Sequence, residues 1–301
     1  MPSPTSSRAR NVVADARAGR RSPARPAGRS SRNGASAAGD GHSSVGASVA
    51  GFVRAVGPTL LLFLVIRAFL IEAFRIPSGS MIPTLLVGDW LFVNKLVYGP
   101  HVPFTRFALP GYAEPARGDV VVFESPYQRD EAERGADPQP TLVKRLMGVP
   151  GDTVYMRDGL YHVNGVAQRQ GYAAAANPRG TGGSSTPDEE SELFGWQAEY
   201  ALAQSRFGAA PARPTHDNWG PLVVPPGRYL MLGDNRYCSK DSRYWGLVPR
   251  ANLRGRPLFV YYSYRPGADE NGPGVCDPDR SEKPLPFVTD VRWGRVGDAI
   301  R

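Results

Sequence analysis

A long apolar segment near the N-terminus limits this chain to few arrangements. A membrane-spanning helix needs about 20 consecutive, mostly apolar residues. The window Ser48–Ile66 has this character and contains one charged residue, Arg54, close enough to an end for its side chain to reach the interface. Arg67 and Glu72 then fall at the opposite interface. We therefore expect one permanent transmembrane anchor at residues 48–74.

Two other interpretations of the apolar segment compete with this one. A cleaved signal peptide would carry an unusually long charged region of some fifty residues, and no small-x-small cleavage site follows the apolar run. A buried helix of a soluble domain would have similar composition, so that alternative stays open at this point.

Positive charge is concentrated ahead of the apolar segment. Residues 1–50 hold eight arginines and two aspartates, which supply +6 of the formal net charge of +8. Because segments rich in Lys and Arg stay on the cytoplasmic side, we expect residues 1–47 to form a disordered cytoplasmic tail that can contact phospholipid headgroups, and residues 75–301 to be extracytoplasmic. The nearly neutral remainder has no cluster of basic and aromatic residues, so nucleic acid is not an expected partner.

The remainder of the chain has the pattern of an all-β domain. Short apolar or alternating runs are separated by turn sequences such as Asp158-Gly159 and Asn164-Gly165, which favour hairpins. Residues 168–222 break the pattern, and we interpret them as an insertion with a helix near Trp196–Gln204. The expected strands are Trp90–Asn94, Val120–Glu124, Leu142–Met147, Thr153–Met156, Leu160–Val163, Tyr229–Leu232 and Leu258–Tyr264.

Residues 77–85 present two serines on a constrained backbone. The sequence is Pro-Ser-Gly-Ser-Met-Ile-Pro-Thr-Leu, in which Ser78 and Ser80 flank a glycine and prolines lie on both sides. Proline disfavours a helix here, so the segment is expected to be extended. A serine hydroxyl needs an adjacent base to act as a nucleophile.

Lys144 is the best candidate for that base. The chain has four lysines and 32 arginines, and a buried lysine, unlike an arginine, can lose its proton in a protein. Alternation within Leu142–Met147 puts Lys144 on the face of Leu142 and Leu146, with Arg145 on the opposite face. Desolvation there would keep the amine neutral near operating pH. A lysine at a strand edge with a solvated amine is the competing interpretation.

Other nucleophile–base combinations fit less well. His216-Asp217 could belong to a Ser-His-Asp triad, but it lies in the expected insertion, and we expect a solvated loop pair. Ser80 is in neither a Gly-x-Ser-x-Gly nor a Ser-x-x-Lys motif. Cys238 is expected to be a small core thiol. Cys238 and Cys276 have no metal-ligand spacing, and the sequence leaves open whether they form a disulfide.

A loop dense in polar residues follows the apolar strand that ends at Leu232. Residues 233–246 read Gly-Asp-Asn-Arg-Tyr-Cys-Ser-Lys-Asp-Ser-Arg-Tyr-Trp-Gly. Loops of this kind are usually solvated turns. This one could also bring the Ser239 hydroxyl to the lysine amine as an orienting partner, with Asp241 and Arg243 paired to hold the loop.

These segments, in this order, resemble the bacterial type I signal peptidases, also called leader peptidases. The resemblance covers most of residues 65–125, 141–165 and 225–265, and it is specific because several spaced motifs occur in the family's order. Tyr237-Cys238 departs from the family, which commonly has Asp-Asn before the serine. The matching motifs are Pro77–Leu85, Arg117–Phe123, Val143–Arg145 with Gly148–Asp152, Gly233–Arg236, and Ser239 with Asp241–Gly246.

The resemblance implies a signal-peptidase-like β fold and a serine endopeptidase that works without metal or cofactor. It implies Ser80 as the nucleophile, Lys144 as the general base, and the Ser78 hydroxyl with the Ser80 amide as the oxyanion hole. The implied supporting residues are Ser239, Asp241 and Arg243.

The resemblance also implies the substrate and its location. Exported preproteins would be cut after small-x-small (Ala-x-Ala) sites at the bacterial inner membrane. The substrate would add an extended strand beside Phe74–Ser80 and Leu142–Val143. The residues expected to line its pockets are Phe74, Ile76, Pro77, Met81, Leu85, Leu142 and Val143.

Two functions from other classes compete with this one. A self-cleaving Ser–Lys repressor would share the dyad and a β fold, but it would need a DNA-binding domain, and residues 1–50 contain none. A non-enzymatic membrane-tethered β scaffold would explain the apolar segment and the strands, yet it gives no reason for the polar motifs.

Overall fold

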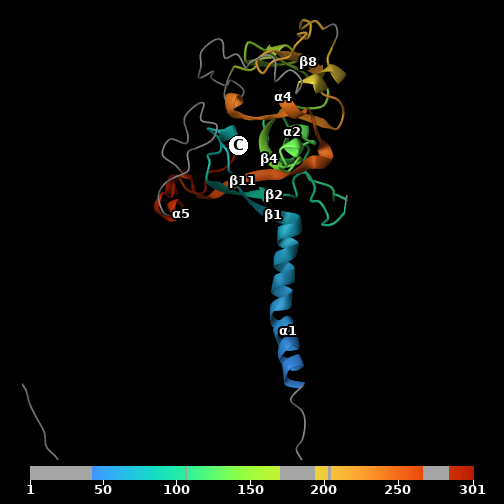
Figure 1. The fold of residues 1–301 in the computed structure, drawn as a ribbon. Coiled ribbons are helices and arrows are strands. Elements are labelled where there is room, and N and C mark those ends of the chain that lie inside the picture. Colours follow the sequence, from blue (N-terminus) through green and yellow to red (C-terminus); the bar gives the residue numbers. More distant parts are fainter. Residues whose placement is uncertain (1–42, 106, 170–193, 203–204, 267–284) are drawn as a thin grey trace, which may run out of the picture. The chain divides into compact units, whose positions relative to one another are not determined.

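The computed structural model describes residues 43–105, 107–169, 194–202, 205–266 and 285–301 (Figure 1). The expected tail 1–47 lies almost wholly outside these ranges, as does much of the expected insertion.

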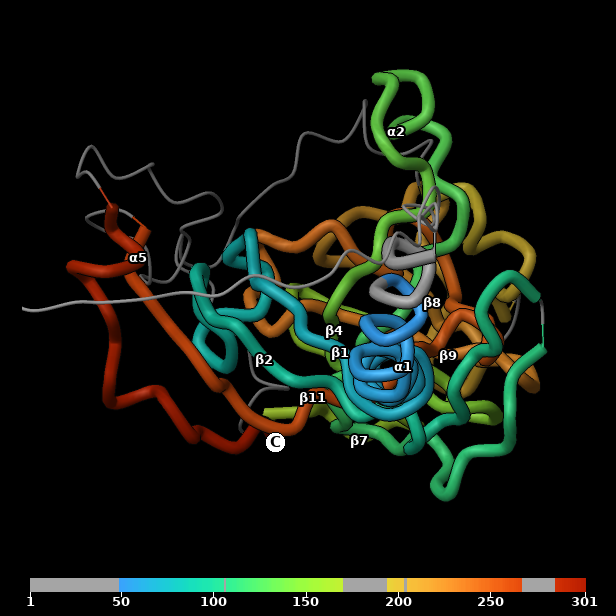
Figure 2. Tube along the Cα trace, turned by 90° about the horizontal axis from the view of Figure 1, so that it is seen from below, coloured from blue at the N-terminus to red at the C-terminus, as the bar shows by residue number. Residues whose placement is uncertain are grey.

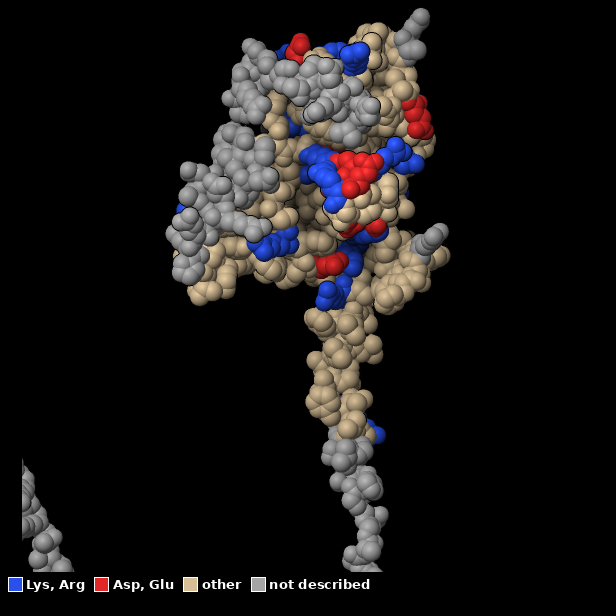
Figure 3. All heavy atoms as spheres, viewed as in Figure 1, with Lys and Arg blue, Asp and Glu red and all other residues tan. Residues whose placement is uncertain are grey.

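The apolar segment forms a helix that leads directly into the first strand. Helix α1 (Ser43–Val65) continues through a π-helical segment (Ile66–Leu70) into β1 (Ile71–Arg75). Val49–Leu70 is long and apolar enough to cross a membrane, with a mean hydropathy of 2.1 and none of its window buried. Figure 3 shows that most of the surface of this helix carries no charged side chain. The helix therefore ends before Ile71, and residues 71–74, expected to belong to the anchor, lie in β1.

Among the described residues, seven strands form an antiparallel sheet in the order β1-β2-β11-β3-β4-β9-β10. Strands β1, β2 and β11 lie side by side in Figure 2. This sheet contains every expected strand outside residues 153–163; most change by only one or two residues at the ends, but the last begins at Leu253 and not at Leu258. Its further members are β2 (Asp89–Asn94), β3 (Val120–Glu124), β4 (Thr141–Gly148), β9 (Arg228–Leu232), β10 (Val248–Pro249) and β11 (Leu253–Ser263).

A smaller sheet of the described part has four strands in the order β7-β6-β5-β8. These are β5 (Thr153–Arg157), β6 (Leu160–Val163), β7 (Val166–Ala167) and β8 (Trp219–Val223). Strand β8 lies inside the segment interpreted as an insertion, yet it pairs with β5 and buries Trp219 almost completely. The β framework therefore resumes before residue 222. The all-β fold class is confirmed.

Helices contribute little to the β-rich part of the chain that the structure describes. The helix expected near Trp196–Gln204 is a short 3₁₀ helix, η4 (Gly195–Glu199). The other short helices are α2 (Arg129–Glu133), α4 (Ser242–Trp245), α5 (Pro286–Thr289) and the 3₁₀ turns η2 (Gly79–Met81), η5 (Arg236–Cys238), η6 (Arg250–Asn252) and η7 (Trp293–Arg295).

Strand β2 buries one of its faces and leaves the other partly exposed. In β2, Leu91 and Val93 are fully buried, whereas Trp90 and Phe92 are only half-buried. This alternation is what a strand with one face on the core produces. The outer face of β2 therefore carries aromatic side chains.

Trp219 tests whether β8 belongs to the structural framework. Because its side chain is 1% exposed within the core of the smaller sheet, Trp219→Ala should lower the free energy of unfolding by about 3–5 kcal/mol. Trp293, which is 75% exposed, provides the matched control. Trp293→Ala should change the free energy of unfolding by less than about 0.5 kcal/mol. Denaturant unfolding of the full chain in detergent measures both, and equal effects would contradict the packing described.

Candidate active site

Ser80 lies in the short turn that follows β1. Ser78 is extended and half-buried, and η2 begins at the next residue. Ser80 itself is 8% exposed. Asn235 holds this turn: its amide N–H donates to the Ser80 carbonyl at 3.1 Å, and its side-chain nitrogen donates to the Gly79 carbonyl at 3.1 Å. The serine is therefore fixed by the loop that follows β9.

Lys144 meets Ser80 from β4. Nζ of Lys144 lies 2.6 Å from Oγ of Ser80, and the lysine is 4% exposed. Burial lowers the pKa of Lys144 from 10.5 to about 8; Arg243 contributes to this decrease, while Asp241 and Asp234 oppose it. The solvated strand-edge alternative is thus wrong. The pair has the spacing of a nucleophile and its base.

The Asp241–Arg243 pair holds the loop that faces the lysine. Nε of Arg243 donates to Asp241 at 2.8 Å, Nη2 donates to the second carboxylate oxygen at 2.8 Å, and both side chains are fully buried. Asp241 also accepts the Gly233 amide at 3.0 Å. Burial opposes its charge, but Arg243 and this amide outweigh burial and lower the pKa of Asp241.

A second buried ion pair connects the serine segment to the same loop. Nε of Arg145 donates to Asp234 at 2.8 Å and Nη2 at 2.7 Å, with both side chains 1% exposed. The Thr84 hydroxyl donates to Asp234 at 2.6 Å, and Nη1 of Arg145 donates to the Gly118 carbonyl at 2.7 Å. Through these hydrogen bonds, Arg145 connects β4 with the loop that holds Asp234 and with the turn at Gly118, and Asp234 connects the same loop with the serine segment at Thr84.

Ser239 is brought to the site, but the expected hydrogen bond to the lysine is not made. Its Oγ is buried and has no hydrogen-bond partner among the described residues. A Cβ at Gly233 would overlap Ser239 Oγ and the Ser80 carbonyl oxygen, so both serines pack against this glycine. Only glycine allows the loop to approach Ser80 so closely.

His216 is not the solvated loop residue that we expected. It is 7% exposed and lies within hydrogen-bond distance of the Arg236 carbonyl (2.8 Å) and of Asp217 (2.6 Å). Its ring also contacts the Arg243 guanidinium. The imidazole therefore packs behind the Asp241–Arg243 pair, a position that strand and loop patterns do not reveal.

Cys238 is not the core thiol that we expected, because it is disulfide-bonded in this structure. Cys276, the other cysteine of the sequence, lies outside the described residues. Among the residues that are described, no group of three or more His, Cys, Asp or Glu side chains could hold a metal ion.

The expected substrate-contacting residues lie in three different environments. Ile76, Met81 and Leu85 are buried in one core cluster, against which Phe74 and Val143 pack. Leu142 instead packs with Leu146 in a different cluster, and Pro77 is exposed. Alternation along β4 separates Leu142 from Val143 in this way.

Comparison with known proteins identifies the family. Residues 49–262 match the family model described as signal peptidase, peptidase S26. The signal peptidase I of Pseudomonas aeruginosa is 39% identical over 222 residues, covering 69% of this chain and 70% of that protein. The enzyme of Pseudomonas fluorescens is 38% identical, covering 69% and 70%, and that of Leptolyngbya laminosa is 32% identical, covering 70% and 78%. The chain therefore belongs to the signal peptidase family, peptidase S26.

Membership of this family gives the general activity. The chain is a serine endopeptidase that removes signal peptides from preproteins. Its apolar N-terminal helix fits a membrane-anchored protein.

Sequence reasoning missed the polar groups that hold Ser80 and Lys144 in place. Thr84, Arg145, Asp234 and Asn235 all lie inside or next to the motifs on which the family resemblance rests. Their position in those motifs was the available signal. Their partners could not be inferred, because the hydrogen bonds join segments far apart in the sequence.

The buried Asp234 carboxylate should matter far more for stability than an exposed one. Asp234→Ala leaves the Arg145 guanidinium buried without its carboxylate and should lower the free energy of unfolding by about 3–5 kcal/mol. Asp130, which pairs with Arg134 and Lys240 near the surface, is the control; Asp130→Ala should cost at most about 1 kcal/mol. Chemical unfolding of both variants makes the comparison, and a small effect at Asp234 would contradict it.

Proposed function

We propose that Ser80 is the nucleophile and Lys144 the general base of this signal peptidase. The single observation that carries the proposal is the buried contact of 2.6 Å between Nζ and Oγ, with the pKa of the lysine near 8. A neutral amine at this distance can accept the hydroxyl proton as the serine attacks. His216 is engaged with Arg236 and Arg243, so the geometry favours lysine over a histidine base.

The reaction then has two steps. Ser80 Oγ attacks the scissile carbonyl while its proton passes to Lys144 Nζ, and that proton goes on to the leaving amine. The acyl-enzyme is hydrolysed by a water molecule that Lys144 activates in the same way. We assign the oxyanion hole to the Ser80 amide and the Ser78 hydroxyl; losing one such donor typically slows a reaction by about 100–1000-fold.

Ser239 is assigned to the lysine amine during the second step. Its hydroxyl lies beside Ser80 across Gly233 and has no partner among the described residues in the resting site. When Ser80 is acylated, its oxygen no longer carries a proton for the amine, and the Ser239 hydroxyl is the nearby group that can orient Nζ. Asp241 and Arg243 support this loop rather than touch the reacting atoms.

The substrate binds as an extended strand between the Phe74–Ser80 segment and Leu142–Val143. Strand β1 is at the end of the sheet order, so one of its edges has no strand partner in the described part of the chain. Ile76, Met81, Leu85 and Val143 form the wall behind it. Because these side chains are already packed, a large substrate side chain would have to displace them, which favours small-x-small sites such as Ala-x-Ala.

We also propose a single-pass topology at the bacterial inner membrane. The arginine-rich N-terminal residues remain cytoplasmic, and the β domain lies on the extracytoplasmic side, as the positive-inside rule requires. Membrane phospholipids and the signal peptides of exported preproteins are then its partners.

Replacing the two dyad residues tests the mechanism. Ser80→Ala and Lys144→Ala should each reduce preprotein cleavage by about 10⁴-fold or more, because they remove the nucleophile or its base. Lys144→Arg is a more specific test of the base, since arginine keeps the positive charge but supplies no group that deprotonates. This variant should cleave the preprotein at least about 100-fold more slowly. Lys240→Arg, at a partly exposed lysine paired with Asp130 and Glu131, is the control and should keep full activity. Normal turnover of Lys144→Arg would rule out lysine as the base.

The pH dependence follows from the lowered pKa of Lys144. The amine accepts a proton only when neutral, and its neutral fraction increases as the pH rises through about 8. The value of kcat/KM should therefore rise with pH, be half-maximal near pH 8, and fall about tenfold for each pH unit well below that. Measurement between pH 5 and 10 with a non-ionisable peptide substrate checks this, and a midpoint near 10.5 would mean a solvated ammonium group.

A further inference from the structure

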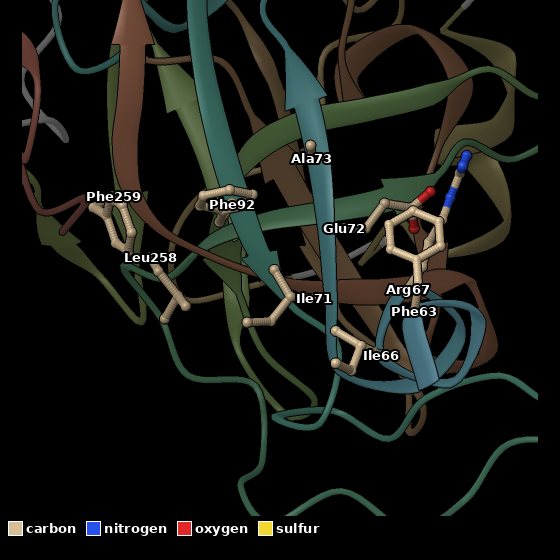
Figure 4. Close-up of a pocket in the computed structure, with 9 residues that line it drawn as sticks. All are labelled: Phe63, Ile66, Arg67, Ile71, Glu72, Ala73, Phe92, Leu258 and Phe259. Carbon is tan, nitrogen blue, oxygen red and sulfur yellow. The ribbon is translucent and has the colours of Figure 1, made fainter. Parts of the chain in front are cut away.

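A groove lined mainly by apolar side chains lies where the membrane helix meets the sheet (Figure 4). Phe63 and Ile66 contribute from the helix, Ile71 from β1, and Phe92 and Leu258 from β2 and β11. Its volume of about 590 Å³ falls within the range of ~300–1,000 Å³ usual for ligand sites.

The groove is accessible, and its lining is unusual for a sheet surface. Ile66, Ile71 and Leu258 are each 38–39% exposed. The register shift in β11 between Pro257 and Phe259 leaves Leu258 and Phe259 both exposed instead of alternating. Contiguous exposed apolar surface of this kind marks a binding site.

The few charged groups at the groove lie at one side of β1. In Figure 4, Arg67 and Glu72 lie on the opposite side of β1 from Phe92, Leu258 and Phe259. Glu72 is paired with Lys95 at 3.1 Å. The remainder of the lining is uncharged, so the groove suits an apolar occupant.

We propose that this groove binds the apolar segment of the signal peptide that precedes the cleavage site. The inference rests on the proposed function, because it takes the cleavage point from Ser80 and the substrate strand from the free edge of β1.

The direction of the substrate strand leads to this occupant. In a signal peptide the apolar segment lies on the N-terminal side of the cleavage site, so that segment comes from the membrane. The enzyme's own chain leaves its helix at Leu70 and runs through β1 to Ser80. A substrate beside β1 with its scissile bond at Ser80 must therefore run parallel to β1, with its upstream residues returning toward Ile71.

The spacing matches the groove. An extended strand advances about 3.3 Å per residue. If the substrate strand has the same rise per residue as the enzyme segment beside it, the substrate residue next to Ala73 is about seven residues before the scissile bond. Ala73 lines the groove. The substrate's apolar segment then lies next to the groove where it leaves the strand site, and this adjacency favours it over the acyl chain of a phospholipid.

The test compares two substrates and two matched variants of the full chain in phospholipid vesicles. One substrate is a preprotein with its whole apolar segment, and the other is a short peptide that spans only the cleavage site. Leu258→Glu puts a charge into the groove. Leu96→Glu is the control, because Leu96 is 40% exposed and follows Lys95, which bonds the end of the same helix, but it does not line the groove.

Leu258→Glu should reduce kcat/KM for the preprotein by about tenfold, the effect of losing one buried apolar contact, and leave peptide cleavage unchanged. Leu96→Glu should change neither. Equal losses for the preprotein in both variants would overturn the inference, because they would report general membrane contact. Failure of the unmodified chain to cut either substrate would instead reject the proposed function.

Photocrosslinking identifies the occupant directly and does not depend on turnover. A photoreactive phenylalanine analogue replaces Phe92 in full-length Ser80→Ala protein, which retains the bound preprotein. Crosslinks to the apolar segment of the preprotein are expected. Crosslinks to phospholipid alone, or to residues after the cleavage site, would overturn the inference.

Discussion

The contact between Lys144 Nζ and Ser80 Oγ requires an amine that is neutral although it is buried beside several charges. Two carboxylates, Asp234 and Asp241, raise its pKa, and Arg243 lowers it. Because Asp241 is bound to Arg243 and Asp234 to Arg145, these charges largely offset one another. Burial is then the largest influence, and it favours the uncharged amine. The two ion pairs therefore fix the loop around the lysine without holding the proton on it.

Three distant segments must meet for that contact to form. Ser80 and Lys144 are 64 residues apart. The third segment is the loop after β9, residues 233–246, which contacts the serine turn and places charged groups near the lysine. Asn235 holds the serine turn, Asp241 holds the Gly233 amide, and His216 packs against Arg243 from behind. A change at any of these polar groups should disturb the contact between Ser80 and Lys144, because buried polar networks lose stability when one member is removed.

Several features could be predicted from the sequence because they depend on local patterns. The alternation of apolar residues predicted the all-β class and most of the strands. Because lysine is rare in this arginine-rich chain, a lysine within an apolar strand was the candidate base. Prediction failed where a pattern depends on distant partners. Strand β8 looked like an insertion because β5, the strand with which it pairs, lies on the other side of that segment in the sequence. His216 looked solvated because Arg236 and Arg243, which bury it, are 20 or more residues away.

The sequence alone determined the identity of the chemical groups: a serine between prolines, a lysine in an apolar strand, and an apolar segment ahead of both. Composition and spacing are sufficient for this, because they set which side chains can deprotonate or enter a membrane. Only the tertiary structure decided how close the amine lies to the hydroxyl, how little solvent reaches it, and that the Ser239 hydroxyl has no hydrogen-bond partner among the described residues. Those properties arise from burial and from contacts across the fold, which no local stretch of sequence contains.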